Sequence, residues 1–299
     1  MAKVIGLSPL HLLSSEQMPL TDERLIGAQL QWFGVDNEHR NQANPHPVFG
    51  VEDVSYHFNA KGYRCPEFGI GTFENHLTVV SIGASEVLGT GIPEAQLFSN
   101  VFATYLKDGL QRPVIHFNLG MGGASADYVS RILASALPVL KPDIVLLIFP
   151  YYGRREHINS QGRFFLFNNQ YSQPNAKLKL SDPENYSQIK ANALLSRDYS
   201  DQLNFYKNYQ FCESLCEKYK ACWLFSAYRM AFFEQIDSLI NIKHFVTPGL
   251  GDLKLKYQDN PSIGLARDMG HPGIMPHKEM AENLFERLKS LYFDRLGFG

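Results

Sequence analysis

The sequence predicts an α/β protein, a three-layer α/β/α sandwich built on a mostly parallel sheet of about five strands. Several short runs are apolar at almost every position, as in Ile144–Phe149, and such runs are typical of strands covered on both faces of a parallel sheet. These runs alternate with longer segments of helical periodicity. That alternation indicates right-handed β–α–β units.

The predicted strands begin near residue 76. Leu77–Ile82 is a mainly apolar run rich in β-branched residues, and Ile144–Phe149 is a continuous apolar run; both are bounded by turn residues. Segments 114–119 and 221–225 have the same character, and 245–246 is expected to add a short fifth strand.

The predicted helices lie between and after these strands. Pro93 is a favoured first helical residue, and the apolar positions after it keep helical spacing as far as Gly109. Ala126–Leu140 is the second predicted helix, and a third runs from about 198 to 219. The last begins near Pro276, with an apolar inward face and a charged outward face.

The chain divides into an extension and a main domain. Residues 1–75 show weak periodicity and are expected to form an irregular N-terminal extension packed on the core of an α/β/α domain over 76–299. Segment 151–197 has no clear period and is far longer than the ~2–6 residues usual for loops in an α/β unit. It is expected to be a long insertion, either a cap over the site or a surface ornament.

Composition excludes several classes of partner. The net charge is −2, and the longest basic cluster is Arg154-Arg155, which argues against nucleic acid. No run approaches the ~20 apolar residues of a membrane span, and no signal peptide is evident, so a cytoplasmic protein is expected. The four cysteines lack metal-binding spacing, and neither a metal nor a cofactor is expected. The sequence gives no indication of the oligomeric state.

A serine follows the first predicted strand. In Gly83-Ala84-Ser85 an apolar run ends on a serine at a glycine-rich turn, which is how a strand presents a nucleophile. Val87 stands where the nucleophile elbow of an α/β-hydrolase has glycine, so that type of elbow is excluded. A simple turn is the other interpretation.

Glycines follow the second predicted strand, in Asn118-Leu-Gly-Met-Gly-Gly-Ala-Ser125. Their backbone N–H groups could hold the phosphate of a dinucleotide or stabilise an oxyanion. The acidic residue that binds a ribose ~20 residues further on is absent, since Asp143 precedes its strand.

The third segment is Asp268-Met-Gly-His271, just before the last helix. Asp268 could orient the imidazole of His271, which could then exchange a proton with Ser85. His277, six residues later, is expected to be an exposed bystander.

The order of these blocks resembles the SGNH hydrolases, also called GDSL-type esterases, whose fold is flavodoxin-like. Gly83-Ala84-Ser85 with Gly89 is similar to their first block, although Ala84 replaces the aspartate. Asp268-Met-Gly-His271-Pro272 is similar to their last block. Asn59-Ala-Lys-Gly-Tyr-Arg64 is similar to a stretch that precedes the serine in some extended members.

The resemblance implies a role for each block. The catalytic residues would be Ser85, His271 and Asp268, and the N–H groups of Ser85 and Gly123 would form the oxyanion hole. The family's third block supplies an oxyanion-binding asparagine, and this chain has Tyr152 in its place. Tyr152, Arg154 or Arg155 would have to substitute as oxyanion or substrate contacts; a salt bridge of the arginines with Glu156 is the alternative.

The resulting prediction is a serine esterase without metal or cofactor. Its substrate would be a short acyl or O-acetyl ester, carbohydrate esters included, and transfer of the acyl group to an acceptor other than water stays open. A non-catalytic relative that binds a glycan or a protein is the alternative function, and a dinucleotide-binding enzyme is a third.

Overall fold

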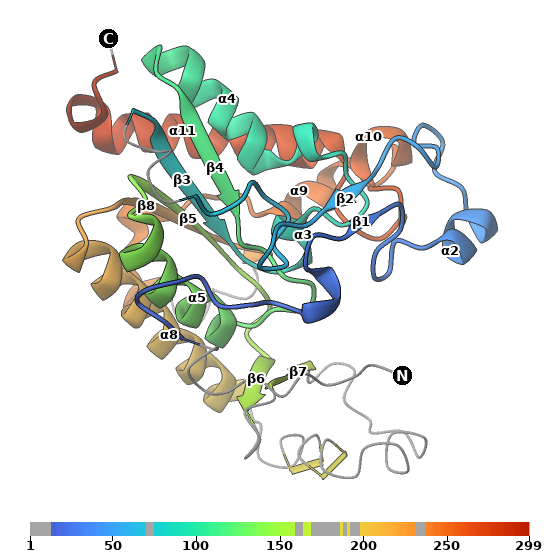
Figure 1. Cartoon of the computed structure of the whole chain (residues 1–299), viewed down its shortest axis with the longest axis horizontal. Coiled ribbons are helices and arrows are strands. Elements are labelled where there is room, and N and C mark those ends of the chain that lie inside the picture. The colour runs from blue at the N-terminus through green and yellow to red at the C-terminus, as the bar shows by residue number, and fades with distance from the viewer. Residues whose placement is uncertain are drawn as a thin grey trace.

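The computed structural model describes residues 13–69, 75–158, 164–168, 186–187, 190–191, 198–230 and 237–298. At its centre is a parallel sheet of four strands in the order β4-β3-β5-β8 (Figure 1). These strands are β3 (Leu77–Ile82), β4 (Val114–Asn118), β5 (Ile144–Phe149) and β8 (Cys222–Ala227). Every residue of β3, β5 and β8 is buried, because helices cover both faces of the sheet.

The fifth strand expected at 245–246 is wrong. Phe245 makes only an isolated parallel bridge to Phe225 of β8. The 3-10 helix η5 (Ile242–His244) ends directly before this segment and α9 (Leu250–Tyr257) begins soon after it, so too few extended residues remain to form a ladder.

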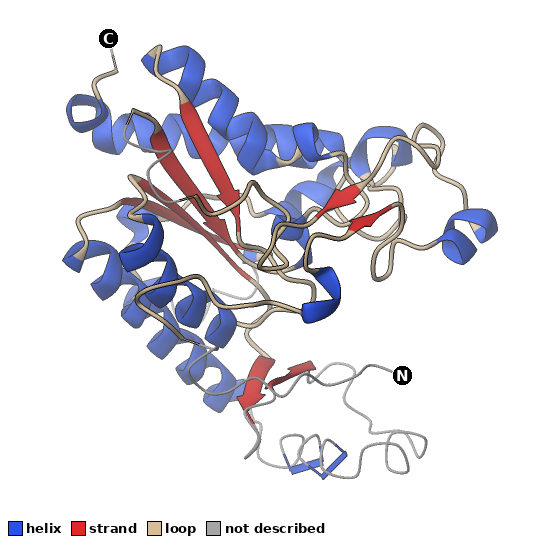
Figure 2. Ribbon diagram, in the orientation of Figure 1, coloured by secondary structure: helices blue, strands red, loops and turns tan. Residues whose placement is uncertain are grey.

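Helices form the two outer layers (Figure 2). On one face, α5 (Ala126–Leu140) and α8 (Asp198–Lys218) share a buried hydrophobic cluster with the sheet. On the other face, α4 (Phe98–Leu110), α9 and α11 (Ile274–Leu296) share a second cluster with it. The three-layer α/β/α architecture is therefore confirmed.

Local chemistry sets where these helices begin. The Ser125 hydroxyl accepts a hydrogen bond from the Tyr128 N–H and so caps α5 at its predicted start. Pro93 instead caps the short 3-10 helix η2 (Glu94–Gln96), and α4 begins only at Phe98. The short α10 (Pro261–Gly264) leads into the loop that precedes α11.

The N-terminal segment packs across the end of the sheet. It contains η1 (Glu23–Leu25), α2 (Glu38–Ala43) and an antiparallel pair, β1 (Gln29–Leu30) with β2 (Tyr56–His57). Its buried side chains form a third hydrophobic cluster with residues that follow Ser85 and one that precedes Asp268. The fully buried members are Phe49, Val54, Tyr56, Phe58, Leu88, Ile92, Leu97 and Ala266. The extension therefore shares its core with the segments that carry the predicted catalytic residues.

The described part of the predicted insertion contains a second antiparallel pair. β6 (Arg154–Ile158) follows β5 almost directly and pairs with β7 (Phe164–Asn168). Most of the remainder of segment 151–197 lies outside the described residues. Residues 231–236 also lie outside them, and the 3-10 helix η4 (Asp237–Leu239) follows directly.

Candidate active site

Ser85 is the first residue of the short helix α3 (Ser85–Leu88), directly after β3. The turn needs a glycine before it, because a Cβ on Gly83 would lie 2.4 Å from a Val87 methyl and 2.7 Å from the Ile148 carbonyl oxygen. Gly89 ends α3 with a φ of 81°, a left-handed conformation that favours glycine. The serine therefore stands at the carboxyl edge of the sheet, where ligands bind in this architecture.

The loop before α11 brings His271 and Asp268 to the same edge. His271 Nε2 lies 2.8 Å from Ser85 Oγ, and His271 Nδ1 lies 2.7 Å from Asp268 Oδ2. The second carboxylate oxygen of Asp268 accepts the N–H groups of Gly270 at 3.1 Å and His271 at 3.0 Å. One continuous chain of hydrogen bonds thus joins Ser85, His271 and Asp268. Ser85 and His271 are 186 positions apart in the sequence.

The electrostatics of Asp268 fix the direction of that chain. Burial alone would raise the pKa of Asp268, but the hydrogen bond and charge of His271, with the two backbone N–H groups, hold this pKa below its ordinary value. The ionised carboxylate accepts the Nδ1–H of His271. Nε2 is then left as an acceptor that faces the Ser85 hydroxyl.

The glycine-rich loop after β4 lies beside α3. A Cβ on Gly120 would stand 2.3 Å from the Leu88 nitrogen, so Gly120 is needed for close packing and not for ligand contact. Asn118 fixes this approach by donating to the Val87 carbonyl at 2.7 Å and accepting the Gly120 N–H at 2.9 Å.

Gly122 and Gly123 are the open part of this loop. Gly123 has a φ of 78°, and nothing lies within 4 Å of where a Cβ on Gly122 would stand. Among the described residues, the N–H groups of Ser85, Gly122 and Gly123 have no hydrogen-bond partner. They are the donors that an oxyanion could use.

The three residues expected to replace the missing asparagine have different surroundings. The Arg154 guanidinium reaches the glycine-rich loop, where Nη1 lies 3.4 Å from the Ala124 carbonyl oxygen. Tyr152 packs against the hydrophobic cluster beneath α5, and its ring lies 4.6 Å from the ring of Tyr151 at a tilt of 40°. Arg155 forms an ion pair at 2.8 Å with Asp201 on α8, so it turns away from the loop.

Glu156 is not the partner of either arginine. Its carboxylate binds Arg131 of α5 at 2.6 Å, and its N–H donates to Asp127 at 2.9 Å. The alternative of a salt bridge from Arg154 or Arg155 to Glu156 is therefore wrong, because the Glu156 carboxylate is already engaged by Arg131.

Two buried arginines, Arg64 and Arg267, brace the segments that carry Ser85 and Asp268, and no pattern in the sequence reveals this role. Arg64 is 1% exposed and donates to the carbonyl oxygens of Gly89 at 2.7 Å and Ile92 at 3.0 Å, just after α3. Arg64 was noted only as part of a family-like stretch. The structure shows that it anchors the turn behind Ser85.

Arg267, directly before Asp268, is fully buried against the N-terminal segment. It forms a two-pronged ion pair with Asp36, at 2.6 and 3.0 Å. The Tyr56 hydroxyl donates to Asp36 at 2.6 Å and accepts the Gly91 N–H at 2.8 Å. The backbone N–H of Arg267 also donates to the backbone carbonyl oxygen of Gly91. Gly91 therefore joins the turn after Ser85 to the loop that carries Asp268.

Charged groups surround Tyr228, which follows β8. Burial raises the pKa of the Tyr228 phenol to about 12; the charges of Glu86 and Asp268 raise it, and those of Arg154 and Arg229 lower it. Glu86 is 4% exposed, and its Oε2 lies 3.5 Å from Ser85 Oγ. The site is therefore lined by both signs of charge.

A second serine–histidine pair lies inside the fold. Ser81 Oγ is 2.8 Å from His116 Nε2, and His116 Nδ1 is 2.7 Å from the Asn100 amide oxygen. Burial lowers the pKa of His116 to about 3, and Ser81 has no exposed surface. His116 and Asn100 line a small pocket of about 240 Å³, but Ser81 itself is fully buried, so its hydroxyl is not open to a substrate.

His277 was expected to be exposed, and that expectation is wrong. Its ring is 1% exposed, stacks on Phe98, and accepts the Phe98 N–H at 3.1 Å. Burial lowers its pKa to about 3. The histidine therefore locks the start of α4 to α11, a role that a sequence pattern does not reveal.

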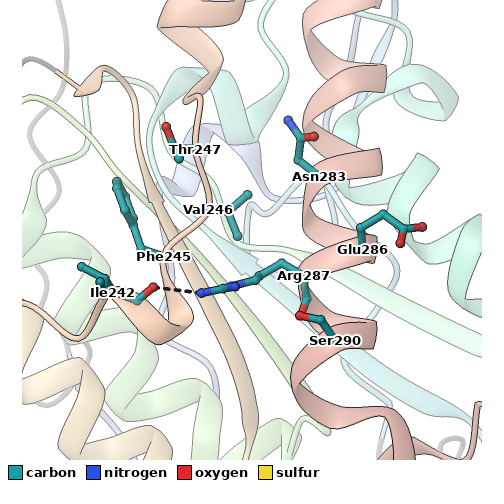
Figure 3. A pocket seen from close by; sticks show the side chains of 8 residues that line it. All are labelled: Ile242, Phe245, Val246, Thr247, Asn283, Glu286, Arg287 and Ser290. Carbon is teal, nitrogen blue, oxygen red and sulfur yellow. Dashed lines mark hydrogen bonds between the residues drawn. The ribbon is translucent and has the colours of Figure 1, made fainter.

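A separate groove of about 530 Å³ lies between segment 242–247 and α11 (Figure 3). Arg287 crosses it and donates to the Ile242 carbonyl oxygen at 3.1 Å. None of the predicted catalytic residues lines this groove.

The described residues contain neither a metal-binding cluster nor a membrane-spanning helix. No three or more His, Cys, Asp or Glu side chains in the described part of the chain are grouped to hold a metal ion. No helix within the described ranges is both long and apolar enough to cross a bilayer.

Comparison with known proteins gives structural neighbours only. No protein-family model matches the chain, and no curated protein sequence matches it. An esterase, EstA from Pseudoalteromonas, is 12% identical; the match covers 72% of this chain and 97% of that protein, with a TM-score of 0.43.

Other solved structures carry related names. A G-D-S-L family protein from Desulfitobacterium hafniense is 16% identical over 71% of this chain and 99% of its own, with a TM-score of 0.41. The acetyl xylan esterase AlAXEase is 16% identical over 70% of this chain and 98% of its own, also at 0.41. The solved structures that this chain is similar to therefore include proteins named as esterases and as a member of the G-D-S-L family.

Proposed function

We propose that this protein is a serine ester hydrolase whose nucleophile is Ser85. The observation that carries the proposal is the chain of hydrogen bonds from Ser85 Oγ through His271 to the ionised Asp268, at 2.8 and 2.7 Å. An aligned serine, imidazole and carboxylate at the carboxyl edge of a parallel sheet is the arrangement that acyl transfer requires.

In the proposed first step, Ser85 Oγ attacks the ester carbonyl carbon while His271 Nε2 takes the hydroxyl proton. The resulting oxyanion accepts the N–H groups of Ser85 and Gly123, with Arg154 as the candidate for the missing asparagine. The bond to the alcohol then breaks, and His271 returns its proton to the alcohol oxygen. Water, deprotonated by His271, attacks the acyl-Ser85, releasing the acid and the serine hydroxyl.

We propose a short acyl or O-acetyl ester as the substrate, carbohydrate esters included. The half-exposed setting of the site supports access for a small ester, since the His271 side chain is 19% exposed. Transfer of the acyl group to an acceptor other than water would use the same acyl-enzyme.

The test is covalent labelling with a fluorophosphonate, followed by mass spectrometry of the adduct. We expect the adduct on Ser85, and no adduct in Ser85→Ala or His271→Ala. Ser81 is the matched control, because it also lies 2.8 Å from a histidine but is buried. An unlabelled wild-type protein, under conditions that label a known serine esterase fully, would instead favour a non-catalytic binding protein.

A further inference from the structure

Three cations border the candidate active site without a close carboxylate partner. Among the described residues, Arg154 Nη1 has one hydrogen-bond partner, the Ala124 carbonyl oxygen, and Lys254 Nζ donates to the Gly270 carbonyl oxygen between Asp268 and His271. Arg229 Nε lies 3.9 Å from Asp252, at the limit of an ion pair. Within the described ranges, no carboxylate lies within 4.0 Å of the charged nitrogens of Arg154 or Lys254.

Several cations elsewhere in the described part of the chain are paired much more closely. Four of them contact a carboxylate at 2.6 to 2.8 Å: Arg131 with Glu156, Arg155 with Asp201, Arg267 with Asp36, and Lys256 with Glu279. An unpaired guanidinium beside a ligand site is a ready partner for a carboxylate or phosphate, which it can bind with two hydrogen bonds.

The three cations come from separate elements that meet at this edge. Arg154 begins β6, Arg229 follows β8, and Lys254 lies on α9. Arg229 and α9 are in contact, because a Cβ on Gly251 would stand 2.7 Å from the Arg229 Cγ. Arg229 and Lys254 thus form one positive flank on the His271 side.

The acidic groups nearby do not cancel this flank. Asp268 is engaged by His271, and Asp252 Oδ2 accepts the Met230 N–H at 2.8 Å. Glu86 is buried on the Ser85 side of the site. Donors also remain unused, since the Nε groups of Arg154 and Arg229 are buried without a partner among the described residues.

We propose that the substrate is an ester that carries an anionic group, a carboxylate or a phosphate, and that Arg229 and Lys254 bind this group. The inference rests on the proposed ester hydrolysis and adds a substrate class to it. Arg229 and Lys254 set specificity, whereas Ser85 and His271 carry out the reaction.

The test compares matched aryl acetates. The neutral ester is methyl para-acetoxybenzoate, and the anionic esters are para-acetoxybenzoate and para-acetoxyphenyl phosphate, which separate a carboxylate from a phosphate. The quantity measured is the ratio of kcat/KM for each anionic ester to that for the neutral one. We expect Arg229→Gln and Lys254→Gln each to lower this ratio about ten-fold, the effect of one charge at close range near a protein surface.

Lys278→Gln is the control, because Lys278 is an exposed cation on α11 and its loss should leave the ratio within about two-fold of wild type. An equal ratio in wild type and both rim variants would overturn the inference while leaving the hydrolase function in place. If wild type cleaves none of the esters and Ser85 is not labelled by a fluorophosphonate, the hydrolase function itself fails, and the substrate class fails with it.

Discussion

Removing the Tyr56 hydroxyl should lower both the stability of the protein and the rate at which Ser85 is labelled. This hydroxyl is fully buried, accepts the Gly91 N–H at 2.8 Å and donates to Asp36 at 2.6 Å. Tyr56→Phe keeps the ring and leaves the Gly91 N–H without a partner. The lost bond to a charged group and the unsatisfied donor together should lower the free energy of unfolding by about 2–4 kcal/mol.

The effect on reactivity follows from where Gly91 lies. A Cβ on Gly91 would be 3.0 Å from the Arg267 nitrogen and 3.1 Å from the Asp268 nitrogen, so this residue rests directly on the backbone of the Asp268 loop. A shift of Gly91 moves Ser85 relative to His271. Since a misplacement of about 1 Å can cost about 10²-fold in rate, we expect fluorophosphonate labelling of Tyr56→Phe to slow by about 10- to 100-fold.

Tyr209→Phe is a matched control. The Tyr209 side chain is also buried, and its hydroxyl accepts the Asn241 N–H at 2.8 Å and donates to Glu213 at 3.1 Å, but it lies on α8. Both variants should lose similar stability in urea unfolding, and only Tyr56→Phe should lose labelling rate, measured well below both melting temperatures. Equal labelling rates in the two variants would refute a positioning role for Tyr56.

The remaining predictions concern the turn, the carboxylate and pH. Gly120→Ala should cost about 1–3 kcal/mol and slow Ser85 labelling, since its Cβ would meet the α3 backbone; Gly122→Ala, with open space, should change stability by less than about 0.5 kcal/mol in urea. Asp268→Asn should reduce the labelling rate by about 10³–10⁴-fold, because the amide does not hold the same imidazole tautomer; a loss below ten-fold would exclude that role. The low pKa of buried His277, about 3, means that the unfolded chain binds its proton first as pH falls below about 6.5. Its contribution to the free energy of unfolding should then fall by about 1.4 kcal/mol per pH unit towards pH 3. In His277→Gln, the free energy of unfolding measured with urea should therefore depend less steeply on pH than in the wild type.

The sequence predicted the elements that have a strong period. β3 and β5 are mainly apolar runs, and α5 has both helical spacing and a serine cap, so their bounds were predicted correctly. α3 and the β1–β2 pair are too short to show any period and were missed. The fifth strand was wrong because two apolar residues do not determine whether a ladder continues.

The residues of the candidate site could be predicted only where the sequence around each one carries a recognisable pattern. Asp268 and His271 lie three positions apart, and Ser85 ends a recognisable strand, so the order of these blocks was enough to select them. Asp36 and Arg267 are 231 positions apart, and nothing in the sequence near either residue names its partner. The same holds for Arg229 and Lys254, which become one flank only when β8 and α9 meet.

The Asp36–Arg267 ion pair also limits how early during synthesis the candidate site can assemble. At about 5–20 residues per second, a ribosome needs roughly 10–50 s to make the 231 residues that separate the two partners. Until then the Asp36 carboxylate lacks its ion-pair partner Arg267, and the turn after Ser85 lacks its contact with the Asp268 loop. A segment translated 231 residues later therefore completes the packing around Asp36, and formation of the Ser85–His271–Asp268 hydrogen bonds should be a late event of folding.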